Sequence, residues 1–368
     1  MNIVRYHDFA DFTEAGQYHS EWEAFATGNP MLSAQWVIPW WETYKDSLDA
    51  ELCWLAGFSQ DKLVGIAPFY VERKGNKKGR LRVLGDGNVC SDHISLLGHS
   101  AHRALFVSSI TEWLVREAGN SWEAATWECI PSDDHEFLAL GDLLNDAGMS
   151  IYRRPACSSW QVELPKTWDE YLGLLSKNQR KRCRRWCRQW IDSGKLTKMT
   201  VTQPDELDHW FNELCRLHNL RRNFLNEHGV FEDPNFMAFH AHATRELLAK
   251  GQLRLDFLLA DGRPITSEYQ FTNGDTVFSY QSGFDPEYNS IGAGNISLMT
   301  AIKSAIDEGF KTFDFLRGSE FYKQRWAATE TKTLDIHVHQ KNLNGSLGHA
   351  FLGTKDLLRS VRSMMTGQ

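Results

Sequence analysis

Hydrophobic and polar positions follow the same order of elements twice along the chain. Each copy shows two strands joined by a short turn, then a loop, a helix with an apolar residue every three to four positions, and an apolar strand. In the first half these elements cover residues 52–58, 63–71, 105–117 and 124–130. In the second half they cover residues 253–260, 264–272, 295–308 and 312–316. The pattern predicts an α/β fold built from two related units.

A different element separates the two copies. Thr167 and Glu170 have the spacing of a capping box, which predicts a helix that ends at Gly194 with an interruption near Gln179. Two further helices are predicted over residues 204–223 and 235–249. The polar face of the first helix carries cations and no acid: Lys177, Arg180, Lys181, Arg182, Arg184, Arg185 and Arg188.

The length of 368 residues fits about two domains. We predict a first domain over residues 1–160, a second over residues 161–345, and a short basic helix over residues 346–368. The loop of the first copy, residues 84–91, reads LGDGNVCS, and the carboxylate of Asp86 would repel a pyrophosphate. The first domain is therefore predicted to lack a complete cofactor site.

Composition limits the function without naming it. Lys and Arg total 40 against 47 Asp and Glu, for a formal net charge of -7, so the surface as a whole is not built to coat nucleic acid. The chain shows no signal-peptide pattern, and its apolar stretches are shorter than the roughly 20 residues that a membrane span needs. The seven cysteines show no CxxC spacing. We expect a cytoplasmic protein with reduced thiols and no transmembrane segment.

Three segments of the second half carry candidate chemistry. Residues 288–295 read YNSIGAGN before a predicted helix, and small residues at a helix start let a phosphate approach the backbone N–H groups. Residues 314–326 read DFLRGSEFYKQRW and set Tyr322 and Lys323 just past a strand end, where α/β folds place their chemistry. Glu268 lies in a strand, where alternation places its carboxylate either inward, as a functional group, or outward in solvent.

Other kinds of site are disfavoured. The pairs His240/His242 and His337/His339 lack a third ligand at motif spacing, so no metal site is expected. The chain also lacks the GxSxG elbow of many serine hydrolases and the GKS or GKT of a phosphate-binding P-loop.

The second half resembles the GNAT-fold acetyltransferases of the CelD-like family, which is associated with cellulose and exopolysaccharide biosynthesis and is related to the FemAB-type aminoacyltransferases. The resemblance covers about residues 167–332. It implies a GNAT fold, a mixed and splayed sheet flanked by helices, here in two tandem copies. Position 291 departs from the family, because it holds Ile where many relatives have Pro. The matching segments are residues 171–188, 217–224, 229–240, 253–271, 280–295 and 314–326.

The resemblance also implies roles for individual residues. Acyl-CoA, such as acetyl-CoA, would be the co-substrate, and an amine would attack its thioester. Glu268 would take the proton of the amine, Tyr322 would protonate the leaving thiolate, and Lys323 would steady negative charge, with Asp314 as a further candidate catalytic residue. The cofactor-binding residues would be Gln281, Ser282, Gly283, Ser290, Gly292, Ala293, Gly294 and Asn295. The acceptor-binding residues would be Arg180, Arg184, Arg188, His218 and Arg222.

Three functions remain open at this point. The first is an acyl-CoA-dependent N-acyltransferase for an amino sugar, an amino acid or a related amine, small or lipid-linked, which the Gly-rich loop and the acidic net charge favour. The second is a FemAB-like aminoacyl-tRNA-dependent transferase, favoured by residues 177–188, whose cations could bind a polyanion. The third is a non-catalytic partner in a polysaccharide assembly machine. The oligomeric state stays open.

Overall fold

The structure is a computed structural model that describes residues 1–13, 18–73, 79–318 and 321–340. The helix predicted over residues 346–368 lies outside this described part. The elements of the first half are β1 (Asn2–Tyr6), α1 (Phe9–Thr13), α2 (Tyr18–Phe25), α3 (Ala34–Tyr44), β2 (Ala50–Ser59), β3 (Lys62–Glu72), β4 (Gly79–Val83), β5 (Leu97–Gly98), α4 (Arg103–Glu117), β6 (Trp122–Pro131), α5 (His135–Asp146) and β7 (Met149–Glu163). Those of the second half are α6 (Trp168–Leu174), α7 (Lys177–Trp186), β8 (Thr197–Thr200), α8 (Leu207–Phe224), α9 (Pro234–Ala249), β9 (Leu253–Ala260), β10 (Arg263–Asn273), β11 (Thr276–Phe284), α10 (Ala293–Asp307), β12 (Thr312–Arg317) and β13 (Thr329–Gln340).

In the described part of the chain, 13 strands form one mixed sheet, with β5 paired to β3 at its side. Across the sheet the order is β1-β2-β3-β4-β6-β13-β7-β12-β11-β10-β9-β8. Read inward from either edge, this order gives the same unit, in which antiparallel strands lead to one parallel pair, β4 with β6 or β11 with β12. The α/β fold with two tandem, related units is therefore confirmed.

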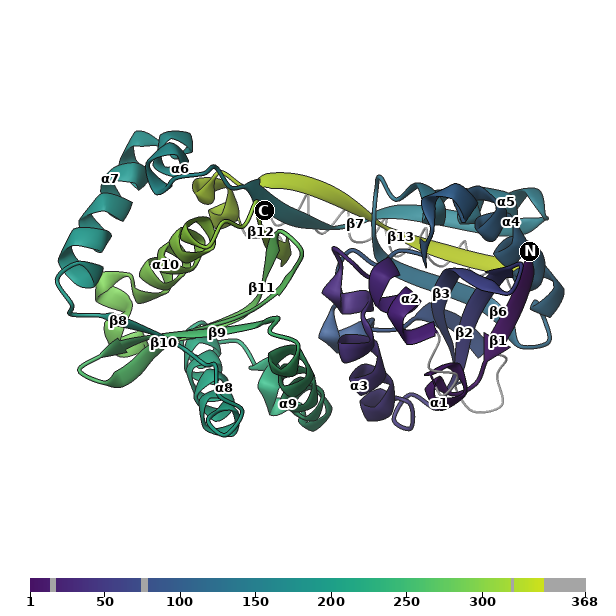
Figure 1. The fold of residues 1–368 in the computed structure, drawn as a ribbon, viewed down its shortest axis with the longest axis horizontal. Coiled ribbons are helices and arrows are strands. Elements are labelled where there is room, and N and C mark those ends of the chain that lie inside the picture. The colour runs from purple at the N-terminus through teal and green to yellow at the C-terminus, as the bar shows by residue number, and fades with distance from the viewer. Residues whose placement is uncertain (14–17, 74–78, 319–320, 341–368) are drawn as a thin grey trace.

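The two units exchange their last strands. β7 ends the first unit along the chain, yet it pairs with β12 of the second, while β13 pairs with β6 of the first. β7 and β13 also pair with each other over most of their length and join the two halves (Figure 1). The boundary predicted between residues 160 and 161 falls within β7.

Helices cover both faces of the sheet in each half. In the second half, α6, α7 and α10 lie on one face, and α8 and α9 lie on the other (Figure 1). A hydrophobic core shared by the halves joins residues of α1 to α3 with residues of α8 and α9, and Trp36 there meets Phe239, Phe271 and Tyr280 edge-on or tilted. Separate cores lie under α4 and α5 and under α6, α7 and α10.

The helix predicted from Thr167 is two helices. The capping box between Thr167 and Glu170 is present and opens α6. The interruption falls at Leu175, earlier than Gln179, because the Ser176 side chain accepts the Gln179 N–H and so caps α7.

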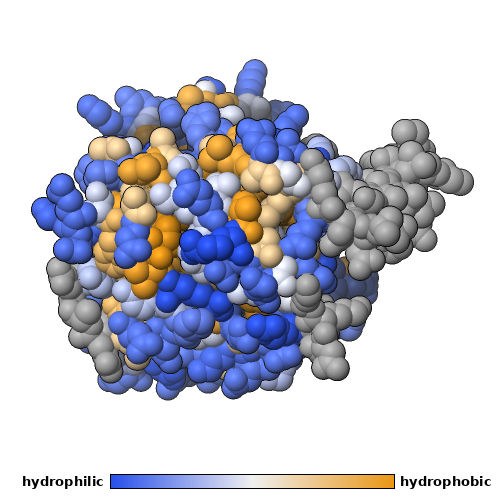
Figure 2. Space-filling model, turned by 90° about the vertical axis from the view of Figure 1, so that its right-hand side faces the viewer, coloured by the Kyte–Doolittle hydropathy of each residue, from blue (hydrophilic) through white to orange (hydrophobic). Residues whose placement is uncertain are grey.

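The outer end of the first half, seen in Figure 2, shows hydrophobic areas interrupted by hydrophilic side chains. Within the described residues, none of the helices combines the length and the apolar character that crossing a membrane requires.

Candidate functional site

The parallel strands β11 and β12 separate after a short stretch of pairing. Their register joins Thr276–Phe278 to Thr312–Asp314, after which the pairing stops and β11 continues to Phe284. A cavity of about 280 Å³ lies at this opening beside the start of α10, and we call it the α10 cavity. It is lined by Arg221, Glu268, Ser279, Ser282, Gly283, Phe284, Asn289, Gly292, Gly294, Asn295, Leu298, Tyr322 and Arg325.

The start of α10 forms one wall of this cavity. Gly292 ends the turn of Pro286–Ile291 with φ +81°, in the left-handed region that favours glycine. The N–H groups of Ala293 and Gly294, which follow it, meet no backbone or side-chain acceptor among the described residues. These two donors and the helix dipole can bind phosphate oxygens.

Glu268 lies at the wall formed by the sheet. On β10 it is opposite Ser282 of β11 and Asp256 of β9, and it is only 4% exposed. Burial raises the pKa of Glu268 to about 8, although a hydrogen bond with Ser297 and the charge of Arg221 act in the other direction. The structure thus decides between the two orientations that alternation left open, and the carboxylate is inward. A carboxyl group with this pKa is suited to accept a proton near neutral pH.

The short helical turn Phe321–Trp326 follows β12 and borders the same opening. Tyr322 is 36% exposed and lines the α10 cavity. Lys323 is buried, and its ammonium donates to the carbonyls of Leu316 at 3.2 Å and Arg317 at 2.9 Å. Lys323 therefore holds the turn against the end of β12.

A second cavity, of about 270 Å³, lies on the side of α8, and we call it the α8 cavity. The two cavities meet, because they share four lining residues: Arg221, Ser279, Ser282 and Tyr322. The α8 cavity is lined by Arg221, Arg222, Leu225, Glu227, Ser279, Tyr280, Gln281, Ser282, Phe315, Arg317, Tyr322 and Lys323.

The helix α8 approaches β11 so closely that its position depends on a glycine. A Cβ atom on Gly283 would lie 2.4 Å from the backbone nitrogen of His218. His218 itself is fully buried, and its Nδ1 lies 3.3 Å from the Ser282 carbonyl. Burial, with the nearby charges of Arg222 and Arg221, lowers the pKa of His218 to about 4, so it is neutral at physiological pH.

The structure brings most of the predicted cofactor and catalytic residues to the two cavities. Those that line the α10 cavity are Glu268, Ser282, Gly283, Gly292, Gly294, Asn295 and Tyr322. Those that line the α8 cavity are Arg222, Gln281, Ser282, Tyr322 and Lys323. The predicted residues that line neither are Arg180, Arg184, Arg188, His218, Ser290, Ala293 and Asp314. The roles of all these residues stay predictions.

The cations of α7 and of the π-helical segment Cys187–Ile191 that continues it divide into two groups. The guanidinium of Arg180 donates to the carbonyls of Leu172, Gly173 and Leu175, so it joins α6 to α7 rather than facing solvent. The exposed cations are Lys177, Lys181, Arg182, Arg184, Arg185 and Arg188. We call the turn Pro286–Ile291, with Gly292, the α10 loop. On the buried side of α7, a Cβ atom at Gly292 would lie 3.5 Å from Trp186, which places this helix beside the α10 loop.

The loop of the first half that corresponds to the α10 loop has a different role. The carboxylate of Asp86 is not offered to a ligand, because it accepts from Arg82 at 2.6 Å and from the Tyr70 hydroxyl at 2.8 Å. The prediction that the first half lacks a complete cofactor site is compatible with this arrangement but stays a prediction.

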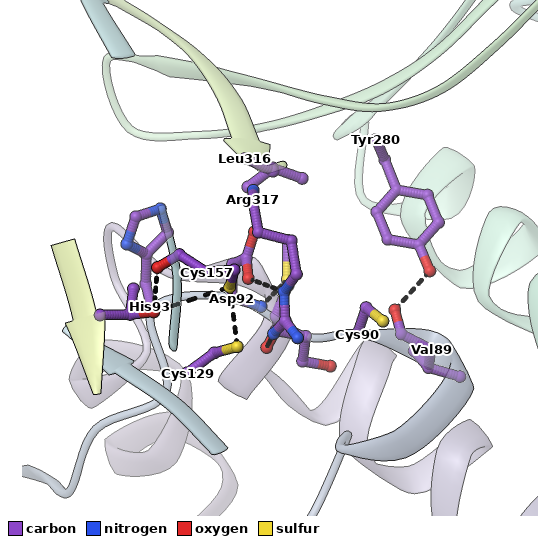
Figure 3. A network of polar contacts seen from close by, with 12 residues as sticks. Val89, Cys90, Asp92, His93, Cys129, Cys157, Tyr280, Leu316 and Arg317 are labelled. Atoms are coloured by element: carbon purple, nitrogen blue, oxygen red, sulfur yellow. Dashed lines mark hydrogen bonds and ion pairs between the residues drawn. The ribbon is translucent and has the colours of Figure 1, made fainter. Parts of the chain in front are cut away.

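The same loop packs against the end of β12 (Figure 3). Asp92 accepts from the backbone N–H of Arg317 at 2.6 Å and also from its guanidinium. The Tyr280 hydroxyl donates to the carbonyl of Val89 at 2.6 Å. The first half therefore supports two residues that line the α8 cavity.

A further cavity, of about 620 Å³, lies at the junction of the halves, and Arg317 lines it together with Cys129 and Cys157. The two sulfur atoms are 2.8 Å apart (Figure 3). The two carboxylates that line this cavity already form ion pairs, Glu128 with Arg82 and Asp335 with Arg154. No group of three or more His, Cys, Asp or Glu side chains that could hold a metal ion occurs among the residues described.

Sequence reasoning missed several lining residues: Arg221, Ser279, Phe284, Asn289, Leu298, Arg317 and Arg325. A signal for Arg221 existed, because it follows Leu214 and Leu217 at helical spacing on the buried side of α8. Its guanidinium donates to the Ser282 hydroxyl at 3.0 Å. No sequence signal points to Arg317, whose position depends on the first half.

Comparison with known proteins identifies the fold of this site. Residues 177–324 match the sequence model of a family described as the acetyltransferase (GNAT) domain. The second half contains a GNAT acetyltransferase domain. The match spans α7 to the turn after β12, so it includes all the lining residues of both cavities except Arg325. Among curated protein sequences, none matches the chain.

Solved structures show the same fold over nearly the whole chain. A crystal structure of FemX superposes with a TM-score of 0.62 at 11% identity, covering 91% of this chain and 97% of FemX. L-PGS from Bacillus licheniformis superposes with a TM-score of 0.53 at 13% identity, and the match covers 88% of this chain and 92% of the L-PGS chain. The C-terminal domain of a putative lysylphosphatidylglycerol synthetase from Agrobacterium fabrum superposes with a TM-score of 0.51 at 12% identity. The match covers 91% of this chain and 95% of that domain. At these identities the likeness shows the fold alone.

Proposed function

We propose that the protein is an acyl-CoA-dependent N-acyltransferase. The observation that carries the proposal is the α10 cavity, which joins the N–H groups at the start of α10 to a buried carboxylate, Glu268, and to a hydroxyl, Tyr322. A pyrophosphate suits the helix start, and the acyl group would reach the opening between β11 and β12. The resemblance to the CelD-like family supports an acceptor from envelope or exopolysaccharide biosynthesis.

Different residues of the α10 cavity would act in different steps of acyl transfer. The Ala293 and Gly294 N–H groups would hold the phosphates of acyl-CoA, whose thioester supplies the activated acyl group. Glu268 would take the proton that the amine loses when it attacks the thioester carbonyl, directly or through one water. Tyr322 would give a hydrogen bond to the thiolate as it leaves, where negative charge develops.

The test combines binding with turnover. Acetyl-CoA and longer acyl-CoAs should raise the melting temperature of the protein, because a ligand of the native state stabilises it by mass action. Free thiol should then appear when amines are added, at a rate that falls with Glu268→Gln. A Gly292→Val variant should weaken the acyl-CoA shift, because a β-branched residue at φ +81° distorts the helix start. Absence of any acyl-CoA shift would contradict the proposal.

One observation favours a second candidate, a FemAB-like transferase that uses aminoacyl-tRNA. Six cations are exposed to solvent on α7 and on the π-helical segment Cys187–Ile191 that continues it, where they could bind the phosphates of a polyanion. The triple variant Arg184→Gln, Arg185→Gln, Arg188→Gln should then weaken tRNA binding and flatten its salt dependence. The triple variant Arg103→Gln, Arg116→Gln, Arg153→Gln, which removes the same charge from the first half, is the matched control. If the protein bound neither acyl-CoA nor charged tRNA, the non-catalytic role would be the remaining candidate.

A further inference from the structure

The α8 cavity carries an excess of positive charge. Four cations line it, Arg221, Arg222, Arg317 and Lys323, against a single carboxylate, Glu227. The α10 cavity has two lining cations, Arg221 and Arg325, beside Glu268. The α8 cavity therefore has the larger number of cations and can bind an anion of its own beside the donor.

The arginines of the α8 cavity are held in place by the protein. Arg317 is fixed by Asp92 and by the carbonyl of Ser91, both from the first half (Figure 3). Arg222 is paired with Glu227 at 2.5 Å, but this carboxylate is half exposed, so water weakens the pairing. Cations already oriented by neighbours lose little freedom when an anion binds.

The α8 cavity also lies where an acceptor can meet the donor. It shares Tyr322 and Ser282 with the α10 cavity, and Ser282 lies opposite Glu268 in the strand register. A small molecule in the α8 cavity can therefore direct one end toward the opening between β11 and β12. Its other end then lies among the arginines.

Building on the proposed function, we propose that the acceptor is an amine that also carries an anionic group, a carboxylate or a phosphate, which Arg222 and Arg317 bind in the α8 cavity. Asp92, Ser91 and Glu227 use only part of the five N–H donors of each guanidinium, so a neutral acceptor would remove water from the remaining donors without replacing its hydrogen bonds, which costs free energy. An anion satisfies them, and a planar guanidinium can bind a carboxylate or a phosphate through two hydrogen bonds. The amine at the other end is then presented toward Glu268.

Matched pairs of amines test this proposal. D-glucosamine 6-phosphate is compared with D-glucosamine, and L-alanine with L-alaninamide, using acetyl-CoA and a thiol-release assay. The charged member of at least one pair should have a kcat/KM at least tenfold higher. The pair that shows the preference also tells phosphate from carboxylate. Arg222→Met should raise KM for the charged member about 10–100-fold, corresponding to the loss of a charged hydrogen bond.

The control is Arg216→Met on the same helix. Arg216 is also paired with an acid, Glu213, at 2.8 Å, yet it lines neither cavity, so its loss should leave the preference unchanged. Equal or better use of the neutral amines would overturn the inference and leave the proposed function standing.

A binding readout separates the two proposals when no amine is acylated. Inorganic phosphate is titrated against the protein saturated with coenzyme A, so that the start of α10 is already occupied. A rise in melting temperature that Arg222→Met removes and Arg216→Met retains supports the anion site. No rise overturns it. Failure of coenzyme A itself to bind would contradict the proposed function instead.

Discussion

His93 of the first half forms an ion pair with Asp314 of the second, with 2.8 Å between Nε2 and Oδ2. The other oxygen of Asp314 accepts the Leu316 N–H at 2.7 Å, so both carboxylate oxygens are engaged. Asp314, a candidate catalytic residue by resemblance, therefore lies in the joint between the halves and borders neither cavity.

This pair should make stability depend on pH. Burial opposes the charged imidazole, but the carboxylate of Asp314 outweighs it and raises the pKa of His93 to about 9. A raised histidine pKa stabilises the fold fully below about pH 6.5, and the contribution is lost as pH rises through 9. His93→Gln should cost about 3 kcal/mol in the free energy of unfolding at pH 6 and almost nothing at pH 10. Urea unfolding at both values checks this, and an equal loss at both would contradict it.

Glu268→Gln should reduce turnover most at high pH. Because burial raises the pKa of Glu268 to about 8, its basic form is scarce at pH 6 and dominant at pH 9. The ratio of wild-type to variant kcat/KM should therefore grow through pH 8 and then level off. The sequence alone, without knowledge of the burial of Glu268, predicts the opposite, a loss chiefly at low pH, where the acceptor amine is most protonated. If the ratio of wild-type to variant kcat/KM did not change with pH, Glu268 would not take part in proton transfer.

Tyr322→Phe should lower turnover by about 10²–10⁴-fold, the usual contribution of a positioned proton or hydrogen-bond donor. The affinity for acyl-CoA should hardly change, since the hydroxyl acts on charge that appears only as the thiolate leaves. Tyr18→Phe, in α2 of the first half, serves as a control. Full activity of Tyr322→Phe with the true acceptor would assign the tyrosine a packing role.

Cys157 should be the most readily alkylated thiol of the described residues. A hydrogen bond from the Cys129 thiol lowers the pKa of Cys157, whereas burial raises that of Cys187, which is also partly exposed. Iodoacetamide at pH 7 should label Cys157 severalfold faster than Cys187, because the thiolate is the nucleophile. Cys129→Ala should remove this advantage. Peptide mass spectrometry measures both rates, and equal rates in the unsubstituted protein would contradict the prediction.

The local patterns of the sequence predicted the second half well. The hairpin of β9 and β10, the helix α10 and the strand β12 each fall within a few residues of the expected ranges. These elements carry strong periodicity or end at glycines, so short-range forces determine them. The α10 loop could be predicted for the same reason, because its tight turn requires a positive φ at Gly292 and therefore a glycine in the sequence.

Features that depend on distant parts of the chain could not be predicted in this way. The exchange of β7 and β13 depends on pairing between residues about 180 positions apart, which no local pattern records. The places of Arg317 and Asp314 depend on Asp92 and His93, more than 220 residues earlier in the sequence. The family resemblance, which does not record these distant contacts, therefore pointed to the site for Asp314, whereas its carboxylate contacts His93 in the joint between the halves.

The strand exchange has a consequence for synthesis on the ribosome. When β7 emerges, its neighbours β12 and β13 do not yet exist, and roughly 150 more residues must be translated before β12 can pair with it. Both edges of β7 thus expose unpaired backbone groups for that interval, in a state prone to join other nascent chains. We expect this protein to depend on chaperones while it is being made, more than its final stability would indicate.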